Sequence, residues 1–180
     1  MKALIVTRFF KTNHLTDFQK MLIESTSCLK IAVNNSGLNN FDYLLFHDYA
    51  HWKSYIAKYP DKKLITVKYP KRRLESIGLD KHFHLFYTSC REPNTPNKND
   101  LFFKMGSIIP AIDFVTKEGA TEILIVGDNK VHNQTFQESI KKSVKRLSEH
   151  ALIYQCTESG NFALPTKSVE EFLDINSLYK

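Results

Sequence analysis

The sequence predicts a single α/β domain in which an open, mainly parallel, Rossmann-like sheet carries helices on both faces. Short apolar runs recur along the chain without the polar alternation of a half-exposed strand, which is typical of strands buried on both faces. Amphipathic helical segments separate several of these runs, and such alternation over a whole chain indicates an α/β sheet. The 180 residues suffice for one well-buried core, while two domains would be cramped, so residues 1–180 are expected to form one domain.

The expected strands are rich in Ile, Leu, Val and Phe, as buried strands are. In chain order they are Ala3–Thr7, Lys30–Val33, Tyr43–Phe46, Leu64–Val67, His84–Tyr87, Glu122–Val126 and Leu152–Gln155. One segment, Ser89–Asp100, is polar and contains Pro93 and Pro96, so it is expected to be a long loop.

Helices are expected where apolar residues recur at helical spacing. The segments concerned are Asp17–Glu24, Ser107–Glu118 and Thr135–Glu149. The first carries Phe18, Met21 and Leu22 on the face that we expect to be buried. In the second, Ser107 is expected to cap the N-terminus and Gly119 to end the helix.

The net charge of +6 suits a phosphate-bearing partner, whether nucleotide, nucleic acid or anionic lipid, without choosing between them. The basic stretch 62–73, with Tyr69 among its lysines and arginines, could contact nucleic acid, but a solvated connection is the preferred interpretation, so a nucleic-acid partner is not expected. No apolar run approaches the roughly 18 residues of a membrane span. Three widely spaced cysteines favour reduced thiols and a cytoplasmic location.

Polar residues follow five of the expected strands. They are Thr7-Arg8, Asn34-Asn35, His47-Asp48, Gly127-Asp128-Asn129 and Thr157-Glu158-Ser159-Gly160. Ligands of open α/β sheets bind beyond the carboxyl ends of the strands, so this edge is the candidate site. The sequence contains no GxGxxG after the first strand, no P-loop, no GxSxG, no HExxH and no paired-cysteine motif, so no metal site is indicated.

The second half of the chain, roughly 107–173, contains four segments whose order matches the sequence pattern of a known family. They read Met105-Gly106-Ser107, then IIPAIDFVTKEGATEILIVGDN, then HNQTFQESIKKSVKRLSEHALIYQC, then TESGNFALPTKSVEEFL. This order resembles a bacterial sialyltransferase-like family: a Thr-Ser-Gly-like turn, an apolar helix, Gly-x-x-Glu-Ile, a strand ending in Gly-x-Asp and a closing Leu-x-x-Phe-Leu. The family includes the Campylobacter-type sialyltransferases, the motility-accessory flagellin glycosyltransferases and an archaeal hydroxymethylpterin diphosphokinase.

The resemblance implies a glycosyltransferase that moves a sugar from a CMP- or other nucleotide-activated donor to a glycan acceptor, with no metal or further cofactor. His132 matches the histidine that acts as general base toward the acceptor hydroxyl. Either Asn34 or Asn35 matches an asparagine that contacts the nucleotide, and Ser107 matches the serine of the Thr-Ser-Gly-like turn. The other strand-end residues expected to bind the nucleotide are Asp128, Asn129, Ser159 and Gly160.

Two departures from the family pattern keep other functions open. The first expected strand leads into Arg8-Phe9-Phe10, where the family has a glycine-rich turn that lets the backbone approach the nucleotide. Only residues 129–131 separate Asp128 from His132, where the sialyltransferases insert a lid that holds the donor phosphate. The alternatives are a non-catalytic nucleotide-binding or interaction protein on the same scaffold, and a pterin-type diphosphotransferase.

Overall fold

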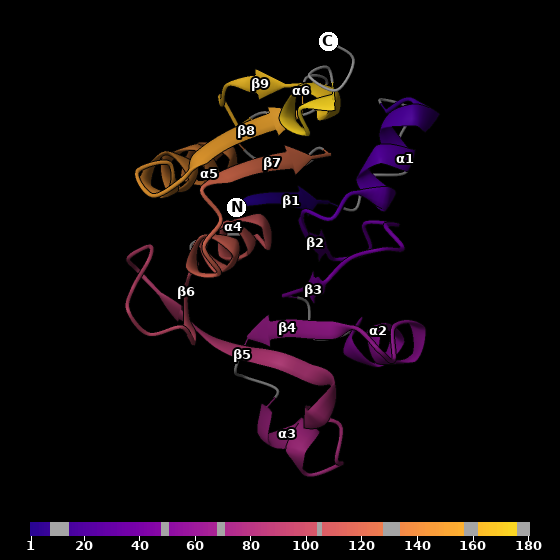
Figure 1. Cartoon of the computed structure of the whole chain (residues 1–180). Coiled ribbons are helices and arrows are strands. Elements are labelled where there is room, and N and C mark those ends of the chain that lie inside the picture. Colours follow the sequence, from indigo (N-terminus) through magenta and orange to yellow (C-terminus); the bar gives the residue numbers. More distant parts are fainter. Residues whose placement is uncertain are drawn as a thin grey trace.

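The computed structural model describes residues 1–7, 15–47, 51–67, 71–103, 106–127, 134–156 and 162–175 (Figure 1). A nine-stranded sheet runs through it in the order β6-β5-β4-β3-β2-β1-β7-β8-β9, and all neighbouring strands are parallel. The strands are β1 (Lys2–Val6), β2 (Leu29–Val33), β3 (Tyr43–Leu45), β4 (Lys63–Val67), β5 (Phe83–Cys90), β6 (Asp100–Phe102), β7 (Glu122–Val126), β8 (Leu152–Cys156) and β9 (Thr166–Lys167). This is the open, Rossmann-like parallel sheet that the sequence predicts.

The strand order reverses beside β1. The chain builds outward from β1 to β6, then returns to the other side of β1 and builds outward again to β9. Ile5 of β1 is therefore in register with Ile31 of β2 on one side and with Ile125 of β7 on the other. In Figure 1, β4 and β5 point left while β7 and β8 point right, because the twist between neighbouring parallel strands accumulates across the sheet.

Helices cover both faces of the sheet. They are α1 (Asp17–Ser25), α2 (Trp52–Lys58), α3 (Lys71–Glu75), α4 (Ile108–Lys117), α5 (Gln134–Leu147) and α6 (Val169–Phe172), with the short 3-10 helix η2 (Asp80–His82) before β5. Alternate residues of each strand face opposite layers. On β1, Ala3 and Ile5 pack with α4 and α5, while Leu4 and Val6 pack on the side of α1, α2, α3 and α6.

Helix α4 is the most deeply buried helix of the described chain. All of its residues from Ile108 to Val115 are buried, between the sheet, β6 and α5. Pro110 lies in its first turn, where a missing N–H costs little. Gly119 follows its C-terminus with a φ of 94°, in the left-handed region that favours glycine, as predicted.

All the predicted strands form, with bounds that differ by at most three residues at an end. The predicted loop Ser89–Asp100 is wrong at both ends. Ser89 extends β5, and Asp100 begins the short edge strand β6, which pairs back onto residues 88–90. A strand of three residues carries no readable periodicity, so its existence depends on the pairing with β5.

The predicted buried face of α1 is wrong for Phe18 and Met21, although Leu22 packs against the core. Phe18 and Met21 are 48% and 55% exposed, whereas Ile23 is fully buried. Contacts with α6 set the rotation of the helix: Gln19 Nε2 donates to Glu170 Oε2 at 3.2 Å. The sequence spacing identifies a helix here, but the packing of α6 selects the side that turns inward.

Candidate functional site

The N-terminal end of α4 meets the end of β2 beside the strand-order reversal. Ser107 Oγ donates to Asn34 Oδ1 at 3.5 Å, across 73 positions of sequence. Asn34 has a φ of 53°, a left-handed conformation in which asparagine is several-fold enriched, and its backbone N–H donates to Leu45 O at 2.9 Å. The fold thus brings together two of the residues that the sequence marks as candidates for nucleotide binding.

The neighbouring asparagine has a different environment. Asn35 Oδ1 accepts a hydrogen bond from Lys58 Nζ at 3.4 Å, and Lys58 is the last residue of α2, on the other face of the sheet. Of the two asparagines between which the sequence does not choose, only Asn34 contacts the N-terminal end of α4.

Ser107 holds the N-cap position of α4 but does not cap the helix with its side chain. Its φ of −84° and ψ of −12° are helical, and no helix N–H donates to its hydroxyl. The predicted capping is therefore wrong in this respect, since a capping hydroxyl normally reaches back from an extended backbone. Thr16 and Ser168 are extended and form capping boxes on α1 and α6. The hydroxyl of Ser107 instead points to Asn34, and no side chain of the described residues caps the first turn of α4.

The ends of β1 and β7 lie side by side at the reversal. Thr7 is buried, and its N–H donates to Val126 O at 3.0 Å. Gly127 follows with a φ of 98°, so the chain leaves β7 in a conformation that side-chain-bearing residues rarely adopt. A ligand in a sheet of this type binds at such a reversal.

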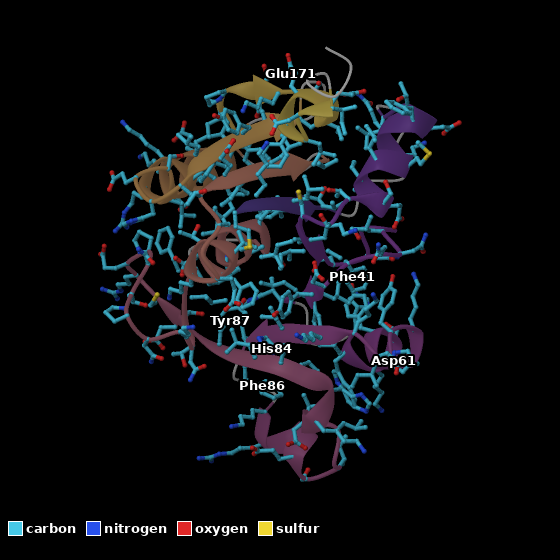
Figure 2. All side chains as sticks on the ribbon, in the orientation of Figure 1. Phe41, Asp61, His84, Phe86, Tyr87 and Glu171 are labelled. Carbon is cyan, nitrogen blue, oxygen red and sulfur yellow. The ribbon has the colours of Figure 1, made fainter. Side chains whose placement is uncertain are left out.

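His47 lies at the same edge, at the end of β3, with partners that the sequence does not reveal. Its Nδ1 is 3.2 Å from the hydroxyl of Tyr87, and its ring stacks on Phe103 with centroids 4.4 Å apart and planes 16° apart. Tyr87 is fully buried, and burial raises the pKa of its phenol, which therefore stays protonated (Figure 2 labels Tyr87). The three rings come from segments after β3, within β5 and after β6, so no sequence spacing connects them.

The remaining candidate residues fall outside the part of the chain that the structure describes. They are His132, Asp128, Asn129, Ser159 and Gly160.

The basic stretch 62–73 and His84 both make contacts within the protein. In the basic stretch 62–73, Lys62 Nζ donates to Phe41 O at 2.9 Å, and Lys71 forms an ion pair with Glu75 at 3.5 Å. His84 packs against Tyr43 at 4.9 Å, and burial, reinforced by the charge of Lys63, lowers its pKa (Figure 2 labels His84).

Among the residues that the structure describes, no three His, Cys, Asp or Glu side chains lie close enough to hold one metal ion. No helix among these residues has the length and apolar character that crossing a bilayer requires.

The fold and this edge define the class of protein as an open α/β sheet with a polar site at a strand-order reversal. The chain matches no family model, no curated protein and no solved structure.

Proposed function

We propose that this chain is a glycosyltransferase-like protein whose carboxyl edge binds the nucleotide of a CMP- or other nucleotide-activated sugar. The contact between Asn34 and Ser107 is the observation that carries the proposal. It brings an amide and a hydroxyl together beside the N-terminus of α4, which no side chain of the described residues caps, next to the strand-order reversal. Helix N-termini favour phosphate because their N–H groups and the helix dipole face the anion.

The proposed reaction transfers the sugar from its nucleotide to a glycan hydroxyl. The acceptor oxygen forms a bond to the anomeric carbon while the bond between that carbon and the phosphate oxygen breaks. The nucleotide leaves with the electron pair of the broken bond, and His132 takes the proton of the acceptor hydroxyl. This role of His132 rests on the sequence resemblance and on its place between β7 and α5 in the chain.

Nucleotide binding can be tested by thermal unfolding with CMP, UMP, AMP and their sugar conjugates. A nucleotide at a hundred times its Kd should stabilise the protein by about 2.7 kcal/mol. The substitutions Asn34→Ala and Ser107→Ala should weaken this stabilisation. The matched control is Asn35→Ala, which removes an amide next to Asn34 that faces Lys58 instead. If no nucleotide stabilises the wild type, the proposal is wrong.

Turnover can be tested with His132→Gln and a CMP-sugar, by following CMP release. A general base contributes about 10² to 10⁴ in rate, so the variant should lose that much turnover while it keeps its nucleotide affinity. Undiminished turnover in the variant would exclude His132 as the base. The second candidate function, a non-catalytic nucleotide-binding protein, is favoured by the absence of the family's glycine-rich turn and lid from the sequence. It predicts nucleotide binding by a wild type that shows no turnover with any nucleotide sugar.

A further inference from the structure

A pocket lies between α5 and the segment that leads into β9, and it involves none of the residues discussed so far. Its volume is about 400 Å³, within the usual range for small-molecule sites. The lining residues on the helix side are Lys141, Lys142, Lys145 and Ser148, and those on the facing segment are Phe162, Ala163, Leu164 and Pro165.

The facing segment gives the pocket an apolar wall that is continuous with the core. Phe162 is only 4% exposed and belongs to the core layer beneath α4 and α5, and Leu164 packs against that layer. Pro165 O accepts the N–H of Gln155 at 3.0 Å, which ties the segment to β8. Ala163 has a φ of 53°, which is uncommon for a residue other than glycine, so the chain bends sharply between Phe162 and Leu164. The apolar wall is therefore fixed at both ends rather than formed by a loose loop.

The helix side carries positive charge that no carboxylate of the described residues pairs with. Lys141, Lys142 and Lys145 are exposed, and no carboxylate lines the pocket. Within the described residues none of the three forms an ion pair, although Glu138 lies one turn earlier on α5. Like charges at this helical spacing disfavour the helix. A bound anion would remove that repulsion.

We infer that this pocket binds a small amphipathic anion, an apolar body that ends in a carboxylate or a phosphate. The apolar body would lie against Phe162 and Leu164, and the anionic group would lie at the lysines. One helix and a four-residue segment line this space, whose volume suits a single small ligand. Arg146 on the same helix is paired with Glu92, so three unpaired lysines remain, fewer than the four to eight basic residues with which proteins usually bind anionic membranes. A free amphiphile therefore fits the pocket better than a lipid surface.

The experiment uses decanoate and decyl phosphate as anionic probes, and decanol and decyltrimethylammonium as neutral and cationic probes of the same chain length. Titration calorimetry should show one saturable site for the anions, at least tenfold weaker binding of decanol, and no binding of the cation. Raising the salt concentration should weaken anion binding, because exposed charges are screened.

The variant Lys141→Gln/Lys145→Gln should weaken decanoate binding at least tenfold and leave decanol binding unchanged. Lys98→Gln is the matched control, because Lys98 is an exposed lysine on the loop between β5 and β6. All substituted positions are exposed, so the melting temperatures without ligand should agree with the wild type. Neither variant should alter CMP binding, and Asn34→Ala should not alter decanoate binding, so this inference and the proposed nucleotide site fail separately.

Equal affinity for decanoate and decanol would overturn the inference. It would also be overturned if Lys98→Gln lost as much decanoate affinity as Lys141→Gln/Lys145→Gln. Absence of decanoate binding would overturn it too. In that case binding to vesicles that contain phosphatidylglycerol would identify a membrane surface instead, and binding to an acidic peptide would identify a protein partner.

Discussion

The two ends of α4 differ in the hydrogen bonds that cap them. At the C-terminal end, the N–H of Gly119 donates to Thr116 O at 3.0 Å and that of Ala120 donates to Val115 O at 2.9 Å. This is a Schellman motif, which satisfies carbonyls that the helix itself leaves unpaired. At the N-terminal end, Ser107 makes no capping bond.

The half of α4 away from the candidate site also holds a buried ion pair. Asp113 is fully buried and accepts the N–H groups of Asn94 at 2.7 Å and Phe102 at 2.9 Å. Lys117 lies 3.4 Å from the same carboxylate and donates to Thr95 Oγ1 at 3.0 Å. One carboxylate thus ties α4 to the connection between β5 and β6 and to β6 itself.

If the proposed nucleotide site is correct, stability and ligand binding depend on opposite ends of one helix. At the C-terminal end, where backbone groups are paired within the protein, a substitution should lower the free energy of unfolding. At the N-terminal end, a substitution should instead lower the affinity for the nucleotide. The predictions below test this division in order of decreasing effect on the free energy of unfolding.

The largest effect is expected for Asp113→Ala. It leaves the Lys117 ammonium, whose side chain is 6% exposed, without its carboxylate, and it leaves two backbone N–H groups unpaired. Removing one partner of a buried pair costs about 3–5 kcal/mol, which urea unfolding would measure. The control Asp17→Ala removes a fully exposed carboxylate 3.4 Å from Lys20 and should cost less than about 1 kcal/mol. Similar losses for both variants would contradict the structural role of Asp113.

A smaller effect is expected for Gly119→Ala at the C-terminal end. A Cβ at this position meets nothing within 4 Å, so the cost is that of holding alanine at a φ of 94°, about 1–2 kcal/mol. Gly119→Asn should cost less, because asparagine tolerates left-handed conformations better. If alanine and asparagine are equally destabilising in urea unfolding, backbone conformation is not the cause.

The N-terminal ends of two helices give a matched pair of substitutions. Thr16→Ala removes a capping box from α1 and should cost about 1 kcal/mol. Ser107→Ala removes a buried hydroxyl that caps nothing and donates one hydrogen bond at 3.5 Å, so it should cost about 0.5 kcal/mol, while it weakens nucleotide binding. A loss from Ser107→Ala as large as that from Thr16→Ala would show that Ser107 serves stability after all.

The smallest effect is a pH dependence at the C-terminal end of α1. Lys30 is 3% exposed, and its Nζ donates to Glu24 O at 3.0 Å and Thr26 O at 2.9 Å. Burial lowers the pKa of its ammonium below 10.5, against the attraction of Asp42 and Glu24. The unfolded chain therefore binds more protons than the folded chain between the lowered pKa and about 10.5, so stability from this group rises with pH in that window.

The wild type should accordingly gain stability relative to Lys30→Met as the pH rises toward 10.5, as measured by urea unfolding at several pH values. Lys20→Met, at a partly exposed lysine of α1, is the matched control for removing a lysine from this part of the fold. A difference between wild type and Lys30→Met that stays constant with pH would contradict the assignment.

The sequence predicts the strands well because buried parallel strands are continuous apolar runs. β7 has the bounds that the sequence predicts, β2 and β4 differ by one residue at one end, and β1 differs by one residue at each end. The two ends of α4 are also placed by local chemistry, with Ser107 before it and Gly119 after it. In the candidate site, the sequence identifies Asn34, Ser107 and His47 as strand-end or helix-end residues, since chains turn where these elements end.

The amino-acid sequence by itself thus determined the class of the fold and the segments that form most of its sheet, because apolar runs and helical spacing report the burial of each segment locally. Only the tertiary structure decided which side of α1 faces inward, that β6 exists, and that Asn34 rather than Asn35 meets Ser107. These outcomes depend on contacts between segments far apart in the chain. Such contacts are set by how the elements pack together, which no local pattern encodes.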